Sequence, residues 1–236
     1  MITEKDRKFY SISGGISLMI VIVLFVLFGT TICSKFTTTQ DENTLLTIEP
    51  AVINESTETR KINIEYPQVR GLGQADHEQV LNDSLRHKFL MFYSEEDSVD
   101  ITLKFEVILN RPEILSIKGE FYRYKWRMAN GINRVISVVF DRSSLKMLHL
   151  NDILYEGFEL ILNRYIKDYL DENMAVNFFK SVSSDQSFCL SETGLEIYFD
   201  EYEAAPGSEG IVIVPVPHDS IAYIVKPNIK SIFNIK

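Results

Sequence analysis

The pattern of apolar and polar residues sets one stretch apart near the N-terminus: residues 9–34 contain no Asp, Glu, Lys or Arg. An α-helix of this length is roughly 39 Å long at about 1.5 Å per residue, enough to cross a hydrocarbon core of ~30 Å. Three basic residues precede the run and only Lys35 follows it closely, and positive flanks stay in the cytoplasm. The pattern predicts a transmembrane helix at 9–34, with residues 1–8 cytoplasmic and the remaining chain extracellular.

The same pattern is compatible with two other interpretations of this apolar run. A cleaved signal peptide also has a basic start and an apolar middle, and a lipoprotein would carry its lipid on Cys33. No small-x-small cleavage site follows Phe28, and Ile32 stands where a lipoprotein signal has a small residue. These departures favour an uncleaved anchor in a single-pass protein of the cell membrane.

Beyond the anchor the composition changes twice. Residues 35–59 are rich in Thr, Glu, Asn and Ser, which predicts a linker with a short extended piece near 45–53. From residue 60 onward, apolar and polar residues alternate with turn signals between them, as in a folded domain. We expect an extracytoplasmic domain with an N-terminal half at 60–150 and a C-terminal half at 151–236.

The N-terminal half carries one helical pattern among strand patterns. In order, the predicted elements are a strand at 62–66 stopped by Pro67, a helix at 76–92, and strands at 101–109, 114–128 and 134–140. The apolar stripe of the helix is formed by Leu81, Leu85, Phe89 and Phe92. The last three strands are joined by short turns, including Asn130-Gly131, which predicts an antiparallel meander.

The C-terminal half repeats this mixture. We predict a helix at 155–170, a short helical piece at 174–179, strands at 188–190, 195–199 and 211–216, and a closing helix near 219–224. Together, the two halves predict an α+β fold with antiparallel sheets and packed helices, preceded by one N-terminal transmembrane helix.

Charge and cysteine content narrow the classes of partner. The 236 residues carry a net charge of −9, and residues 1–8 contribute +1, so the remainder carries −10. An acidic exterior argues against nucleic acid and anionic headgroups and favours a basic partner. Cys33 and Cys189 are the two cysteines of the chain, so the domain has no disulfide framework and its core must hold by packing.

One predicted strand has chemically sorted faces. Its cations alternate with aromatic and apolar residues: Arg123, Lys125 and Arg127 on one face, and Tyr122, Tyr124, Trp126 and Met128 on the other. The functional interpretation is a basic or aromatic binding surface. The simpler interpretation, which we favour, is that the aromatic face lies in the core and the cations pair with acidic residues across the sheet.

A second candidate surface is the acidic turn of Asp200, Glu201 and Glu203, with Tyr202 among them. Its carboxylates could seat a cation or act as an acid and base, but they fit no calcium-loop pattern, so a surface turn is the better interpretation. The four histidines are scattered and no catalytic or nucleotide-binding motif occurs. We therefore expect no cofactor, no metal and no enzymatic activity.

The sequence of the last predicted hairpin resembles that of a known domain family. GLEIYFDEYEAAPGSEGIVIVPVP (194–217) resembles the signature of a bacterial extracytoplasmic domain family of unknown function. YPQVRGLG (66–73), ILSIKGEFYRY (114–124) and VVFDRSSLKMLHLNDIL (138–154) occur upstream in the order typical of that family. The family includes the outer domain of RsiV-type anti-sigma factors, which bind lysozyme, and the N-terminal region of PdaC-type peptidoglycan deacetylases. The resemblance implies an α+β fold in a Gram-positive cell envelope; the segment KWRMANGIN (125–133) departs from the family pattern.

These observations predict a membrane-anchored binding or sensing module of the cell envelope. Its expected ligand is a basic protein such as lysozyme, or a peptidoglycan fragment, and not nucleic acid. The alternative is a cell-wall hydrolase that uses the Asp200–Glu203 cluster. An anti-sigma factor is the least favoured class, because the eight residues before the apolar run are too few for a sigma-binding surface, which takes about 20–30 residues a side.

Overall fold

The computed structural model describes residues 45–235 of the chain. The expected transmembrane helix at 9–34, the cytoplasmic residues 1–8 and Cys33 lie outside these residues. Within the part of the chain that the structure describes, no helix is long and apolar enough to cross a membrane.

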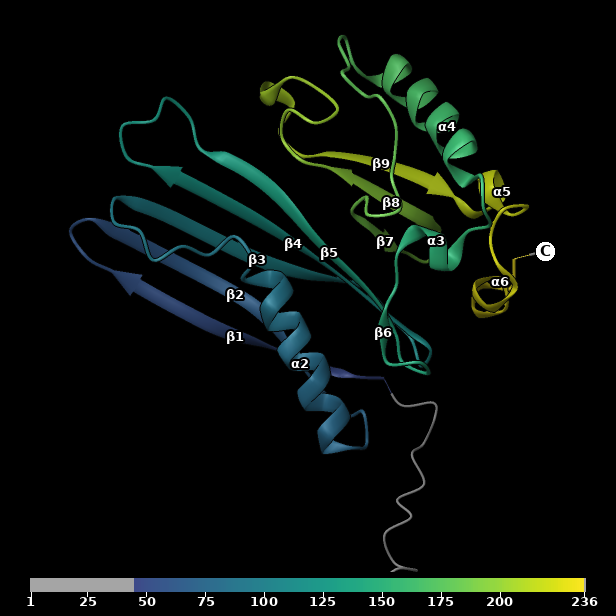
Figure 1. Cartoon of the computed structure of the whole chain (residues 1–236), viewed down its shortest axis with the longest axis horizontal. Coiled ribbons are helices and arrows are strands. Elements are labelled where there is room, and N and C mark those ends of the chain that lie inside the picture. The colour runs from purple at the N-terminus through teal and green to yellow at the C-terminus, as the bar shows by residue number, and fades with distance from the viewer. Residues whose placement is uncertain (1–44, 236) are drawn as a thin grey trace, which may run out of the picture. The chain divides into compact units, whose positions relative to one another are not determined.

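A six-stranded sheet forms the N-terminal part of the domain (Figure 1). Its strands lie side by side in chain order: β1 (Thr47–Ser56), β2 (Arg60–Arg70), β3 (Val99–Asn110), β4 (Ile114–Lys125), β5 (Ile132–Asp141) and β6 (Lys146–Met147). Neighbouring strands pair antiparallel, except that β2 and β3 run parallel. The predicted meander of β3, β4 and β5 is confirmed.

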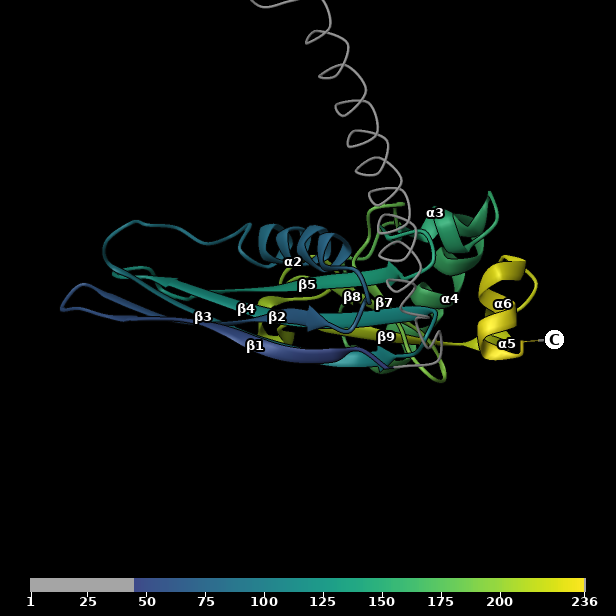
Figure 2. The ribbon, with the colours of Figure 1, turned by 90° about the horizontal axis from the view of Figure 1, so that it is seen from below.

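The helix α2 (Ala75–Phe89) explains the parallel pair. It returns the chain from the end of β2 to the sheet end where β2 began, so β3 starts in the same direction. Figure 2 shows α2 lying along one face of the sheet. Leu81, Leu85 and Phe89 of the predicted stripe are buried there against apolar side chains that alternate along the strands. Phe92, the fourth, is only partly buried and follows the helix, which ends earlier than predicted.

The C-terminal part builds a second, smaller antiparallel sheet from β7 (Phe188–Leu190), β8 (Gly194–Phe199) and β9 (Val212–Pro217). The helices of this part are α3 (Leu150–Ile153), α4 (Phe158–Asn173), α5 (His218–Ile221) and α6 (Pro227–Phe233), with a 3₁₀ turn at Gly207–Glu209. α4 contacts β9 and buries Leu162, Ile166 and Leu170 in the core (Figure 1). The α+β class with mainly antiparallel sheets is confirmed.

The small sheet covers part of the large-sheet face opposite α2. Val135 of β5 packs with Cys189 and Tyr198, and all three are buried. Polar atoms in this interface have partners: Ser116 Oγ accepts the Leu190 N–H at 3.2 Å, and Ser137 Oγ accepts the Phe188 N–H at 3.0 Å. Buried polar groups are normally paired in this way.

Two strands differ from the sequence prediction. β1 occupies residues expected to lie in the linker, and its full ten-residue register with β2 makes it part of the sheet. β2 continues through Pro67 to Arg70, although Pro67 was expected to end it. Pro67 pairs with Pro50 of β1, beyond Ile64 where pairing with β3 ends, so its missing N–H removes no bond to a second neighbour.

The remaining differences lie at turns. Residues 174–179 are not helical, contrary to the prediction, and α6 was not predicted. β4 ends at Lys125 rather than at Met128, because Arg127 adopts a left-handed backbone with φ 70°.

Candidate functional site

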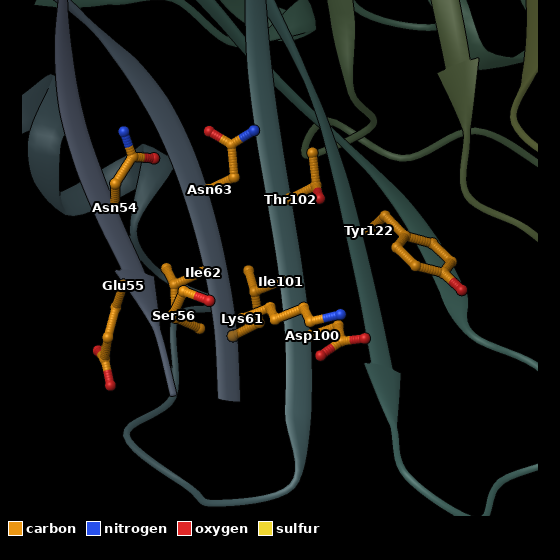
Figure 3. A pocket seen from close by; sticks show the side chains of 10 residues that line it. All are labelled: Asn54, Glu55, Ser56, Lys61, Ile62, Asn63, Asp100, Ile101, Thr102 and Tyr122. Carbon is orange, nitrogen blue, oxygen red and sulfur yellow. The ribbon is translucent and has the colours of Figure 1, made fainter. Parts of the chain in front are cut away.

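A groove of about 740 Å³ lies across the large sheet on the face opposite α2 (Figure 3). Four strands line it, through Asn54, Glu55, Ser56, Lys61, Ile62, Asn63, Asp100, Ile101, Thr102 and Tyr122. Side chains alternate between the two faces of a strand, so Asn63 and Thr102 point away from α2 while their apolar neighbours face it.

Strand register aligns the polar side chains into a row. Asn54 pairs with Asn63, Asn63 with Thr102, Thr102 with Tyr122, and Tyr122 with Asn133. We call the first four of these residues the polar row; Figure 3 shows them in this order. Neighbouring strands are about 4.8 Å apart, so the polar row spans ~14 Å from Asn54 to Tyr122.

The polar row has unused hydrogen-bonding capacity. Among residues 45–235, the side chains of Asn54, Asn63 and Thr102 have no hydrogen-bond partner. Asn is depleted in strands, so two directly paired Asn residues here serve no evident purpose in the sheet itself. The row therefore offers amide and hydroxyl groups to a ligand.

Charged side chains of both signs surround the polar row. Asp100 Oδ1 accepts the Trp126 indole N–H at 3.3 Å, and Figure 3 shows the Lys61 amino group directed toward the same carboxylate. Glu55 Oε2 lies 3.4 Å from Arg60 Nε. No single sign of charge dominates the groove.

Tyr122 closes the polar row with an aromatic ring. The ring lies against Gly131, where a Cβ would come within 2.3 Å of Tyr122 Cε2, and the side chain remains 38% exposed. Gly131, which the sequence marked only as a turn residue, therefore also makes room for this ring. Trp126 and Met128 are exposed nearby along the chain, so the expectation that the aromatic face is core was wrong.

The predicted basic residues lie outside the groove. Arg123 and Lys125 both contact Glu96 Oε2, at 2.9 and 3.2 Å, so the predicted pairing of cations with acidic residues is confirmed for these two. A hydrogen bond from Lys125 and the nearby Arg123 charge hold the pKa of Glu96 below its usual value. Arg127 is exposed in the turn after β4.

The acidic turn is a structural connection between the two sheets. Asp200 accepts hydrogen bonds from Arg134 Nη1 at 2.9 Å and from the Val135 N–H at 2.7 Å. Glu201 Oε2 accepts both the backbone and the side-chain N–H of Asn133, each at 2.9 Å. Through these bonds the two carboxylates hold the turn against β5.

Glu203 and Tyr202 are the other two residues of the acidic turn. Glu203 accepts the Asp200 N–H at 2.8 Å and a hydrogen bond from Gln186 at 3.2 Å. Tyr202 is exposed, with φ 69°, and its ring lies against Gly207. In residues 45–235, no group of three or more His, Cys, Asp or Glu side chains could hold a metal ion.

The structure thus separates the predicted candidates and adds residues that sequence reasoning missed. Asn54, Asn63, Asp100 and Thr102 were not singled out. Their signal was polar residues, three of them Asn or Asp with low strand propensity, at the outward positions of alternating runs. These residues form a site only once the strand register is known.

Comparisons with known proteins show what this domain is similar to. Residues 151–219 match the family model described as a protein of unknown function, DUF3298. Two solved structures share the fold: a DUF3298 family member from Bacteroides fragilis and a DUF3298 family protein from Pseudomonas aeruginosa. The first has a TM-score of 0.64 at 14% identity and covers 80% of this chain and 96% of that one. The second has a TM-score of 0.61 at 18% identity and covers 79% and 97%.

A curated relative adds a particular protein to this class. The chain is 22% identical over 197 residues to the anti-sigma-V factor RsiV of Bacillus subtilis. The match covers 73% of this chain and 68% of that protein. Residues 151–219 thus match the DUF3298 family and the chain is similar to RsiV, so the predicted family resemblance is confirmed. The groove residues precede the segment matched by the family model.

Proposed function

We propose that this protein is a membrane-anchored, extracytoplasmic binding or sensing module of the bacterial cell envelope. In this proposal residues 9–34 anchor the chain, and the domain binds its ligand in the groove of the large sheet. The observation that carries the proposal is the polar row, whose hydrogen-bonding groups are unpaired within residues 45–235 although they stand on rigid strands.

Two ligand classes are candidates. Lysozyme is a basic protein, and the net charge of −9 favours association with such a partner. A peptidoglycan fragment would instead use the hydrogen-bonding groups of the groove. The similarity to RsiV supports a sensing role in the envelope.

The proposal is tested by calorimetry with the full chain, using lysozyme and soluble peptidoglycan fragments as separate ligands. We expect saturable binding of at least one of them. The variant Tyr223→Ala, which removes an exposed side chain outside the groove, is the matched control and should bind as the wild type does. Absence of saturable binding to both ligands at micromolar concentration would exclude the proposal.

The hydrolase alternative lacks such support, since Asp200, Glu201 and Glu203 are engaged in holding β5 and its turn. We expect the full chain to release no soluble product from peptidoglycan. Product release by the wild type that is lost in Glu203→Gln would instead support the hydrolase.

Anti-sigma activity is a second candidate, favoured by the similarity to the anti-sigma-V factor RsiV. It predicts that a sigma factor co-purifies with the full chain from its own cells and is released on ligand addition. If sigma factors are absent from the purified protein, or remain bound on ligand addition, this candidate fails.

A further inference from the structure

We propose that the polar row binds the glycan strand of a wall fragment: a linear, N-acetylated oligosaccharide laid across β1–β4 and stacked on Tyr122. This inference rests on the proposed function and names the part of the fragment that the groove takes.

Hydrogen-bonding chemistry is the first argument. Sugar hydroxyl and acetamido groups are donors and acceptors at once, and each Asn amide also offers both roles. Asn54, Asn63 and Thr102 have no partner among residues 45–235, so binding would break no existing protein bond there. Asp100 uses Oδ1 for the Trp126 indole, which leaves Oδ2 to accept a sugar hydroxyl.

Charge is the second argument. N-acetylglucosamine units are uncharged, and the lactyl carboxyl of N-acetylmuramic acid is neutral where it is amide-linked to a stem, whereas the peptide stems carry free carboxylates and amines. Within the groove the Lys61 amino group is directed toward Asp100 (Figure 3). Glu55 lies beside Arg60, which is hydrogen-bonded to Tyr93 outside the groove. A neutral ligand leaves this arrangement intact, and an ionic one would have to disrupt it.

The aromatic ring is the third argument. The C–H face of a sugar ring is apolar and packs on aromatic rings. Tyr122 presents such a ring at the end of the polar row, exposed to solvent and lying against Gly131. The length of the row, ~14 Å from the strand spacing, exceeds a single sugar ring and predicts affinity that grows with chain length.

The test uses the full chain in a detergent without a sugar headgroup, titrated with the tetramer and the monomer of N-acetylglucosamine. Trp126 is the single tryptophan of the chain and donates to Asp100 at the groove, so its fluorescence reports occupancy. We expect saturable binding of the tetramer, a fluorescence change, and binding of the monomer at least about tenfold weaker.

Variants locate the binding. Asn63→Ala and Tyr122→Ala should each weaken tetramer binding by about tenfold, since each removes one polar or stacking contact. Gly131→Ala should also weaken it, because the new Cβ displaces the Tyr122 ring without removing it. Asn228→Ala and Tyr223→Ala remove exposed side chains elsewhere and should have no effect.

The outcomes separate this inference from the proposed function. Tetramer binding that survives the groove variants overturns the placement in the groove. A chain that binds lysozyme or wall peptides but not the tetramer overturns the glycan and leaves the proposed function standing. A chain that binds none of these ligands overturns both.

Discussion

The face of the large sheet opposite α2 has two halves that differ in whether their polar side chains have hydrogen-bond partners. In the covered half, under the small sheet, Ser116 and Ser137 hydroxyls accept backbone N–H groups of β7. In the open half, Asn63 and Thr102 stand on the same face without a partner among residues 45–235. On one sheet face, these polar side chains of the covered half have hydrogen-bond partners, and those two of the open half have none within the described residues.

This difference teaches where to look for binding. Polarity in the covered half is explained by the fold, because buried groups must be paired. The open half has polar side chains that the fold does not need, and such side chains are characteristic of ligand sites. The family match lies outside this face, since residues 151–219 include the whole small sheet and no strand of the large one.

The largest expected contrast between the halves is in thiol reactivity. Burial raises the pKa of Cys189 from 9.0 to about 12, which lowers the thiolate fraction near neutral pH by about a thousandfold. In a Cys33→Ser background, we expect alkylation of Cys189 to be slower than that of a cysteine introduced in the open half by Thr102→Cys by about this factor. Mass spectrometry of the alkylated protein measures both rates. Equal rates would mean that the small sheet does not keep solvent and reagent away from Cys189.

The next contrast compares two tyrosines. Tyr198 is fully buried between the sheets, and Tyr198→Ala should lower the free energy of unfolding by about 3–5 kcal/mol. Tyr122→Ala in the open half should cost about 1 kcal/mol or less. Urea unfolding followed by circular dichroism measures both. Similar costs would show that Tyr122 serves the core rather than a ligand.

Removal of a hydroxyl gives a smaller contrast. Ser116→Ala leaves the buried Leu190 N–H without its acceptor and should cost about 1–3 kcal/mol. Thr102→Ala, its counterpart in the open half, should stay within about 0.5 kcal/mol. The same unfolding measurement applies, and a costly Thr102 variant would count against the idea that this hydroxyl is free for a ligand.

The smallest expected effect is on the pH dependence of stability. Burial lowers the pKa of His218, Arg111 lowers it further and Asp219 opposes the change. Folded His218 therefore binds its proton less readily than the unfolded chain does, whose pKa is 6.5. This contribution to the free energy of unfolding is fully present above 6.5 and is lost as the pH falls through the lower, folded pKa.

His218→Gln should therefore flatten the slope of stability between about pH 8 and about pH 5, measured by urea midpoints. His87→Gln, on the exposed side of α2, is the matched control. A slope left unchanged by His218→Gln would assign the pH dependence to other groups.

Local pattern was sufficient for much of the fold. The helix at Ala75–Phe89, the meander from β3 to β5 and the strands of the small sheet follow from periodicity and turn residues. β1 was predicted only as a short extended piece of the linker, because its place in the sheet depends on pairing with β2.

The site was harder to predict because it depends on register. Asn54 and Thr102 are 48 residues apart in the sequence and meet only through Asn63. The acidic turn gave a misleading signal for a similar reason: the partners of Asp200 and Glu201 lie more than 60 residues away, in β5. Spacing along the chain carries no information about either arrangement.

The two sheets are also separate in chain order, which has a consequence for folding. All strands of the large sheet lie within residues 47–147, and those of the small sheet lie within 188–217. Because the N-terminal part of a chain emerges first during synthesis, the large sheet can pair before its cover exists. The apolar half around Val135 and Val139 is then transiently exposed to chaperones or to aggregation, whereas the groove half is already in its final, solvated state.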